Sequence, residues 1–269
     1  MNPYLYIVIP AYNETAILPI TLDCLREFLR GQLFAAEVII VDDGSTDNTS
    51  VLAGDWQRSF ECLRVLRNSV NLGKGASIRR GIVASRGECV FVTDADLPGR
   101  PEDILRLLEG LRDGAAVAIA SRRPAPLSSA PSGSRFLASF VYRALVRAIL
   151  NLPLRDTQCG FKAFVREPLL PVVEGLRLEG FSFDVEFLFA AWKRGLQIRE
   201  VDFDVLERRP TRHAILLQSP RMLMDLLRLR FTAGRPPRSV RTQMETPGHP
   251  PKQSDDACLA HDCDVPRHN

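Results

Sequence analysis

Two pairs of acidic residues are the side chains in this sequence best suited to do chemistry. Asp42 and Asp43 follow one short apolar run, and Asp94 and Asp96 follow another. If the second run ends in extended backbone, positions i and i+2 lie on the same side, so Asp94 and Asp96 would share one face. Two carboxylates held this way repel each other unless a cation lies beside them. Oxygen ligands suit Mg²⁺ or Mn²⁺, which bridge protein to phosphate oxygens, so the pairs predict a metal and phosphate site.

Helix capping is the simpler explanation for a single acid that follows a strand. Asp and Ser are common N-cap residues, and capping is our interpretation of Asp47. Capping does not explain a doubled Asp42-Asp43, nor two acids at the i, i+2 spacing of Asp94 and Asp96. These four residues therefore remain the candidates for ligand chemistry.

A glycine-rich stretch with one lysine, residues 71–75, precedes an expected helix and reads Asn-Leu-Gly-Lys-Gly. Glycines allow backbone to approach a phosphate, and Lys74 would place a positive charge near the helix N-terminus. The spacing is not that of a P-loop. It is not a dinucleotide fingerprint either, because the first strand runs into Pro10-Ala11-Tyr12 instead of glycines. A solvated surface lysine is the alternative for Lys74.

The elements that must position these residues alternate between short strands and helices. Apolar runs rich in Val and Ile, without clean alternation, are typical of strands buried on both faces. This order predicts an α/β fold with a mostly parallel sheet flanked by helices, whose ligands bind at the carboxyl ends of the strands. The expected strands are Tyr4–Pro10, Glu37–Val41, Leu63–Leu66, Cys89–Thr93 and Ala115–Ala120, and the expected helices are Glu14–Arg30, Gly75–Ser85 and Pro101–Leu111.

The second half of the chain is less regular. Helical periodicity covers 134–152, 183–194 and 220–231. Residues 156–164 are expected to form a loop followed by a strand, and 198–205 has the composition of a strand. From about residue 232 the chain becomes rich in Pro, Gly and polar residues, so we expect one catalytic domain over 1–231 and a disordered tail over 232–269. The Cys and His residues of the tail match no standard zinc-finger spacing.

Composition and charge exclude several other classes of protein. The 269 residues are 45% hydrophobic and 25% charged, and the net charge of +3 gives no reason to expect a nucleic-acid partner. Three of the six cysteines lie in or beside apolar runs, which is typical of core residues in a reducing compartment. No stretch reaches about 18 uncharged apolar residues, so no membrane-spanning helix is expected, and residues 1–10 do not have the pattern of a signal peptide.

Taken together, the motifs resemble glycosyltransferase family 2 on the GT-A fold. They are IVIPAYNE (7–14), VIIVDDGSTDNT (38–49), NLGKGASIRRG (71–81) and FVTDADL (91–97). A narrower similarity, to the polyprenyl- or dolichyl-phosphate sugar transferases and within them most to the dolichyl-phosphate β-glucosyltransferase branch, is carried by ASRRP (120–124), RDTQCGFKAF (155–164) and FSFDVEFLFAA (181–191).

The resemblance implies roles for individual residues toward a nucleotide-sugar donor. Asp94 and Asp96 would be the acidic pair that holds Mg²⁺ or Mn²⁺, with Asp96 the direct ligand. Many relatives carry Gln two residues beyond the pair, where this chain has Pro98, so water would replace one metal ligand. The implied donor-binding residues are Pro10, Tyr12 and Glu14 at the nucleoside, Asp42 or Asp43 at the base, Lys74 in the nucleotide site, and Arg208 or Arg209 near the diphosphate.

The acceptor implied by the narrower similarity is a polyprenyl phosphate. Arg122, Arg135 and Ser139 align with groups that hold the acceptor phosphate. A monophosphate is already largely anionic near pH 7, because its second pKa is roughly 6. It therefore needs arginines to position it and not a base. A single displacement by this acceptor would invert the sugar carbon.

Other functions are compatible with the same motifs. A transferase acting on a hydroxyl of a glycan or small molecule would need a general base, for which Asp184, catalytic in that case, and Glu186 are the candidates. A nucleotidyltransferase would place its glycines after the first strand, where this chain has Pro10 and Tyr12. A nucleotide-binding scaffold without activity would not need the intact pair Asp94 and Asp96.

A polyprenyl phosphate acceptor would place this protein at a membrane. Residues 135–150 and 221–230 combine apolar positions with arginines, as helices that lie in a lipid–water interface do. Ordinary core-packing helices are the alternative for both segments. With glucose from UDP-glucose or mannose from GDP-mannose as the transferred hexose, we expect a cytoplasmic protein that binds peripherally to the cytoplasmic face of the membrane.

Overall fold

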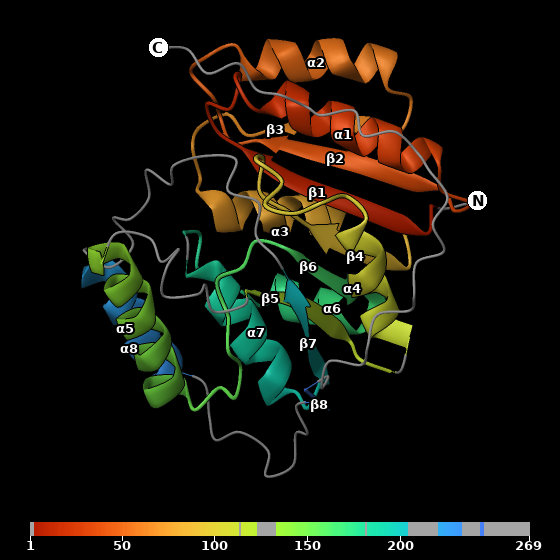
Figure 1. Ribbon diagram of the computed structural model, residues 1–269. Helices are drawn as coiled ribbons and strands as arrows, with labels where there is room; N and C mark the ends of the chain where they lie inside the picture. Colours follow the sequence, from red (N-terminus) through yellow and green to blue (C-terminus); the bar gives the residue numbers. More distant parts are fainter. Residues whose placement is uncertain are drawn as a thin grey trace.

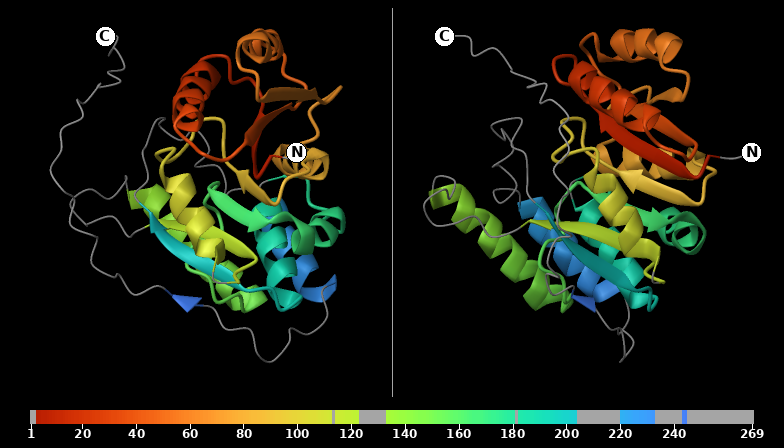
Figure 2. Two further views of the ribbon diagram at one scale, coloured as in Figure 1. Left: turned by 90° about the vertical axis from the view of Figure 1, so that its right-hand side faces the viewer. Right: turned by 45° about the vertical axis from the view of Figure 1, so that its right-hand side comes forward.

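A twisted sheet of eight strands runs through the part of the chain that the structure describes (Figures 1 and 2). The structure is a computed structural model, and it describes residues 3–112, 114–122, 133–180, 182–203, 220–232 and 243–244. The strand order is β3-β2-β1-β4-β6-β5-β7-β8. The strands are β1 Leu5–Ala11, β2 Ala36–Asp42, β3 Leu63–Arg67, β4 Cys89–Val92, β5 Val117–Arg122, β6 Lys162–Val165, β7 Ile198–Phe203 and β8 Gln243–Met244.

The predicted mostly parallel sheet is confirmed, with one exception at its centre. Strands β1 to β4 pair in parallel, as do β5, β7 and β8. Strand β6 lies between β4 and β5 and is antiparallel to both. Because of this register, Lys162 at the start of β6 lies opposite Val92 at the end of β4 and Ile119 in β5.

Helices cover both faces of the sheet. Helices α1, α2 and α4 pack on one face, and α3, α6 and α7 pack on the other. Helices α5 and α8 lie side by side and add buried side chains to the second face (Figure 1). The helices are α1 Leu18–Arg30, α2 Thr49–Ser59, α3 Lys74–Ala84, α4 Asp103–Arg112, α5 Gly133–Leu150, α6 Arg166–Glu174, α7 Phe183–Lys193 and α8 Pro220–Thr232.

Burial on both faces explains why the strands lack an alternating pattern. In β1, Leu5 and Ile7 belong to the core under α1 and α2, whereas Tyr6 and Val8 belong to the core under α3. Since successive side chains of a strand point to opposite faces, a strand covered on both faces must be apolar at nearly every position. All four of these residues are almost completely buried.

Two helices were not among the expected elements, and one expected helix is shorter. Helices α2 and α6 were missed: α2 buries few of its side chains, and α6 contains Pro171, a helix breaker. The helix expected from Glu14 begins at Leu18, because residues 13–15 form a loop that bonds to Ser45, in the loop after β2, and to Thr49, the first residue of α2. Among the described residues no helix is long and apolar enough to span a membrane.

Most of the expected tail lies outside the described residues. Helix α8 ends at Thr232, and the division into a catalytic domain over 1–231 and a disordered tail stays a prediction. Gln243 and Met244 form β8, which pairs with Arg199 and Glu200 of β7.

Candidate active site

Three neighbouring parallel strands bring the predicted polar residues to one edge of the sheet. Strands β2, β1 and β4 are adjacent, and each is followed at its carboxyl end by one of the polar motifs. The prediction that these strand ends meet is therefore confirmed. Pro10 lies in β1, and Tyr12, with 42% of its surface exposed, follows that strand.

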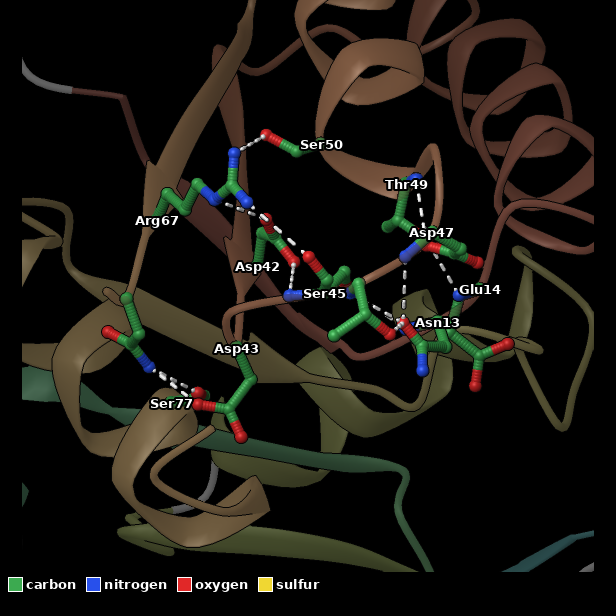
Figure 3. A network of polar contacts seen from close by, with 12 residues as sticks. Asn13, Glu14, Asp42, Asp43, Ser45, Asp47, Thr49, Ser50, Arg67 and Ser77 are labelled. Atoms are coloured by element: carbon green, nitrogen blue, oxygen red, sulfur yellow. Dashed lines mark hydrogen bonds and ion pairs between the residues drawn. The ribbon is translucent and has the colours of Figure 1, made fainter. Parts of the chain in front are cut away.

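Asn13 fastens the loop after β1 to the loop after β2, a role that the sequence did not reveal (Figure 3). Its backbone has φ 56°, a left-handed conformation that Asn tolerates better than most residues. Its side-chain oxygen accepts hydrogen bonds from the backbone N–H groups of Thr46 (2.9 Å) and Asp47 (3.3 Å). The backbone N–H of Glu14 donates to the hydroxyl of Thr49 at 2.8 Å. These contacts hold the proposed nucleoside-binding segments together.

Asp42 and Asp43 are both buried and both accept hydrogen bonds from the protein. Asp42 accepts from the backbone N–H of Ser45 at 3.0 Å and pairs with Arg67 at 3.2 Å (Figure 3). Asp43 accepts from Asn68 at 2.7 Å and from the backbone N–H groups of Leu72 (3.0 Å) and Gly73 (2.8 Å). The two carboxylates thus hold the loops around them, and contact with a nucleotide base stays a prediction for both.

The glycines of residues 71–75 allow close packing in place of the expected approach to a phosphate. The N–H groups of Leu72 and Gly73 are taken by Asp43, and that of Gly75 donates to the carbonyl of Glu179 at 2.7 Å. A Cβ on Gly73 would lie 2.5 Å from this same carbonyl oxygen, and one on Gly75 would lie 2.6 Å from Phe183 Cβ. The glycines were expected to face a phosphate, but they pack against the segment before α7.

Asp47 does not hold the N-cap position of α2, which belongs to Asn48, but from the residue before it Asp47 bonds to the first backbone N–H of the helix. This contact makes the stability of the loop dependent on pH. The Asp47 carboxylate accepts from the backbone N–H of Thr49, the first residue of α2, at 2.9 Å, and from the hydroxyl of Thr15 at 2.6 Å. Burial alone would raise the pKa of Asp47, but the hydrogen bonds from Thr15 and Thr49 outweigh it and lower the pKa from 3.8 to about 2.

We expect Asp47→Ala to lower the free energy of unfolding by about 1 kcal/mol at pH 7, as loss of a cap does. Because the folded-state pKa lies below the ordinary value of 3.8, this contribution is complete above about pH 4 and is lost as the pH falls toward 2. Urea unfolding of both proteins at pH 7 and near pH 3 measures the difference. An unchanged difference at the lower pH would contradict the assignment.

The Asp94–Asp96 pair lies in a turn and not in the extended backbone that was expected. Strand β4 ends at Val92, and the N–H of Leu97 donates to the carbonyl of Asp94 at 3.0 Å. Leu97 has φ 43° and is completely buried. A left-handed leucine costs of order 1–3 kcal/mol, so the surrounding packing must hold this turn in place. The turn leaves both aspartates partly exposed.

A chain of alternating charges surrounds Asp94. Lys74, the first residue of α3, places its Nζ 2.5 Å from Asp94 Oδ1 and 3.7 Å from Asp184 Oδ2. Lys162 places its Nζ 2.7 Å from Asp184 Oδ1. Burial alone would lower the pKa of Lys74, but the charges of Asp94 and Asp184 outweigh it and raise the pKa above its usual value. Burial alone would raise the pKa of Asp94, but Lys74 outweighs it and lowers the pKa.

The segment 156–162 supplies the far wall of this site. A Cβ on Gly160 would lie 2.2 Å from Asp94 Oδ2, so only glycine fits there without moving the carboxylate. Arg122, at the end of β5, forms two hydrogen bonds to the buried Asp156, from Nε at 2.5 Å and from Nη2 at 3.0 Å. The Arg122 side chain keeps 38% of its surface exposed, and its charge also contributes to the lowered pKa of Asp94.

Asp184 and Glu186 both lie in the first turn of α7, and both are engaged by protein groups. Asp184 faces the two lysines described above. Glu186 accepts hydrogen bonds from the backbone N–H groups of Arg177 (3.1 Å) and Leu178 (2.8 Å). Glu186 therefore fixes the segment whose next residue, Glu179, accepts from Gly75.

The acidic pair fits a divalent cation by its donor chemistry. Asp94 and Asp96 offer carboxylate oxygens, and Mg²⁺ is often bound by one or two carboxylates together with substrate phosphates. Within the described ranges no group of three or more His, Cys, Asp or Glu residues gathers around a common point. Substrate oxygens or water would therefore complete any coordination here.

Several predicted site residues cannot be placed as side chains. Arg208 and Arg209 lie outside the described residues. Arg135 and Ser139 lie within the backbone of α5, but their side chains are also outside the description. Pro98 is described, two residues beyond Asp96.

Comparisons with known proteins agree with this geometry. A family model described as glycosyl transferase family 2 matches residues 6–170. The dolichyl-phosphate beta-glucosyltransferase of Homo sapiens is 35% identical over 247 residues, which cover 86% of this chain and 76% of the relative. That of Dictyostelium discoideum is 32% identical and is covered to 75% of its length, again by 86% of this chain.

Solved structures share the fold. A glucosyl-3-phosphoglycerate synthase from Mycobacterium tuberculosis superposes with a TM-score of 0.64 at 24% identity, covering 88% of this chain and 83% of that one. A mannosyltransferase from Pyrobaculum calidifontis, solved in complex with GDP-Man and Mn²⁺, superposes with a TM-score of 0.64 at 20% identity. The superposition covers 88% of this chain and 66% of that one. These similarities identify the fold as GT-A. With the matching family model, the strand-end site and the curated relatives, the chain belongs to glycosyltransferase family 2.

Proposed function

We propose that this protein is an inverting, metal-dependent glucosyltransferase that moves glucose from UDP-glucose to a polyprenyl or dolichyl phosphate. The names of the relatives from Homo sapiens and Dictyostelium discoideum support glucose and a dolichyl phosphate. Mannose from GDP-mannose is the second hexose to test, because one solved structure with this fold is a mannosyltransferase in complex with GDP-Man and Mn²⁺.

The observation that carries this proposal is that protein groups already engage the carboxylates of both candidate bases. Asp184 is neutralised by the ammonium groups of Lys162 and Lys74, and Glu186 accepts from backbone N–H groups. A hydroxyl acceptor requires a base, but a phosphate acceptor arrives already ionised. The site is therefore better suited to a phosphate nucleophile.

The residues around the acidic pair supply what a phosphate nucleophile needs. Arg122 is held in one orientation by the buried Asp156 yet stays partly exposed, so it can bind an anion without first being ordered. Lys74 would stabilise the negative charge that develops on the leaving diphosphate. When bound at Asp94 and Asp96, the divalent cation would act as a Lewis acid toward the same diphosphate. A single attack by the acceptor phosphate opposite the leaving group inverts the sugar carbon.

The experiment that tests this function measures transfer of labelled sugar into lipid. The purified protein is incubated with Mg²⁺, labelled UDP-glucose or GDP-mannose, and a polyprenyl phosphate in detergent. We expect label from UDP-glucose in the organic phase as an alkali-stable, β-linked product. If nucleotide is released without any lipid label, the lipid acceptor is excluded, and hydroxyl acceptors with Asp184 as base become the next test.

Helix α8 offers a surface through which the protein would reach its lipid acceptor. Met222, Leu226 and Leu229 are buried against the core. On a second side of the helix, within an arc of about 100°, lie four exposed apolar residues. They are Leu223, Met224, Leu227 and Phe231, of which Phe231 is 84% exposed. With the exposed Arg228 and Arg230 beside them, we propose that this side binds peripherally to the cytoplasmic face of the membrane.

We expect the double replacement Leu227→Ser and Phe231→Ser to weaken binding to vesicles with anionic lipid at least about tenfold. The two side chains would each lose part of the roughly 1.5–3 kcal/mol gained when such residues leave water. Vesicle co-sedimentation measures the change. Val51→Ser, at a 65% exposed position of α2, is the matched control and should bind as the unchanged protein does. Equal binding by the double variant would exclude α8 as the lipid contact.

A further inference from the structure

Lys162 is a buried lysine at the centre of the sheet, and no role toward the donor has been given to it above. It begins β6, between the end of β4 and the middle of β5, and only 3% of its surface is exposed. A buried ammonium group is costly unless it is paired and hydrogen-bonded. Lys162 has two such partners: it donates to the carbonyl of Cys159 and to Asp184 Oδ1.

The ion pair between Lys162 and Asp184 determines which carboxylate Lys74 contacts most closely. Asp184 lies 2.7 Å from Lys162 and 3.7 Å from Lys74, whereas Lys74 lies 2.5 Å from Asp94. The shorter contact of each carboxylate is thus with a different lysine. Lys162 satisfies Asp184, and Lys74 remains at the acidic pair, beside the place proposed for the diphosphate.

Removing the charge of Lys162 would change this arrangement. Asp184 is a buried carboxylate with 8% of its side chain exposed, and its next cation among the described residues is Lys74. Because an uncompensated buried charge is strongly unfavourable, Asp184 would draw Lys74 toward itself. Lys74 would then be withdrawn from Asp94 and from any phosphate bound nearby.

We propose that Lys162 is a positioning residue for the donor diphosphate. By neutralising Asp184, it keeps Lys74 at Asp94 and available to a phosphate, without touching the nucleotide itself. The inference rests on the proposed function only in taking a nucleoside diphosphate as the ligand of the site. Neither lipid nor sugar transfer is needed to test it.

The first test compares the binding of UDP and of uridine to Lys162→Met in the presence of Mg²⁺, by calorimetry below the unfolding temperature. We expect the affinity for UDP to fall at least about tenfold, while that for uridine stays unchanged, because only the phosphates depend on Lys74. The melting temperature should fall by roughly 5–15 °C, as a buried charge loses its partner. Lys193→Met, near the other end of α7, is the matched control and should bind both ligands normally. Normal UDP binding by Lys162→Met, or an equal loss for uridine, would overturn the proposal.

A double variant keeps the test decisive if Lys162→Met alone does not fold. In Lys162→Met with Asp184→Asn, neither buried charge remains unpaired, so the protein should be more stable than either single variant. With no anion at position 184, Lys74 stays at Asp94, and the affinity for UDP should lie within about threefold of the unchanged protein. A double variant that binds UDP more than tenfold more weakly would show that Lys162 acts on the nucleotide directly, against the proposal. Lipid labelling by the unchanged protein is scored separately, so failure of the proposed transfer is distinguishable from failure of this inference.

Discussion

Asp96→Asn should reduce sugar transfer at least about 10³-fold while leaving the fold intact. The side chain lies in the turn after β4, is partly exposed, and is our proposed direct ligand of the divalent cation. Loss of one group that stabilises a developing negative charge typically costs 10²–10³ in rate. Loss of a metal that acts on the leaving diphosphate should cost at least as much. Initial rates of sugar transfer with saturating Mg²⁺ measure the effect.

Two controls separate a metal role from general damage. Asp55→Asn makes the same chemical change on the exposed surface of α2 and should leave the transfer rate within about twofold. Chelation by EDTA should abolish sugar transfer by the unchanged protein. In Asp96→Asn it should lower the small remaining transfer rate only slightly. If Asp96→Asn keeps more than about a tenth of the rate, or if EDTA has no effect on the unchanged protein, the metal assignment is wrong.

Gly160→Ala should greatly lower the transfer rate while changing the stability of the protein very little. The added Cβ would lie 2.2 Å from Asp94 Oδ2 and 2.7 Å from Asp94 Cγ, so the carboxylate must turn away. The nearest atoms are the end of one side chain and not backbone, which means that the fold can yield at small cost. The site cannot, because Asp94 would lose its present position relative to Lys74. We expect the transfer rate to fall about 100-fold or more with a change in melting temperature of only a few degrees.

Gly54→Ala is the matched control for this substitution. Gly54 lies within α2, and a Cβ there would meet nothing within 4 Å. Alanine favours a helix over glycine by about 1 kcal/mol, so this variant should be slightly more stable and fully active. A Gly160→Ala protein that transfers at the normal rate would show that the position of Asp94 does not limit the reaction.

Much of the fold could be predicted from the sequence because its strands are covered on both faces. Residues such as Ile7 and Val8 have to be apolar side by side, and that run is visible without any structure. The motifs at the strand ends then gave the site. The missed elements are those with weak signals: α2 is mostly polar, and α6 contains Pro171. Strand β6 was expected, but its antiparallel direction depends on a route through space that no local pattern records.

The parts of the site that were missed depend on contacts between distant residues. Lys162 looks like one lysine in a strand until Asp184, 22 positions away, is placed against it. Asn13 reaches residues 33 and 34 positions away, and Gly160 matters because of Asp94. A glycine in a sequence can indicate that another group packs closely against the backbone, but it does not indicate which residue that group belongs to.

Two local expectations were wrong for a shared reason. The glycines of residues 71–75 were expected to let backbone approach a phosphate, and Asp94 and Asp96 were expected in extended backbone. In the structure, Asp43 takes two of the N–H groups of that stretch, and the acids lie in a tight turn. Backbone groups at a crowded strand edge find partners within the protein first, since a buried N–H group without a partner is costly.

The central position of β6 has a consequence for how the chain matures as it is made. Strand β4 is an entirely apolar strand, yet its second edge stays open until residues 162–165 arrive, some 70 residues later, and insert between it and β5. An open apolar edge invites pairing with other chains. When only the first 150 residues have left the ribosome, the nascent chain therefore exposes part of a sheet that is prone to aggregation. It also still lacks Lys162 and Asp184. The strand that closes the sheet and the charged residues of the site are thus made within the same short segment, from Lys162 to Asp184. We therefore expect that a chain cut before β6 would not give two parts that fold alone.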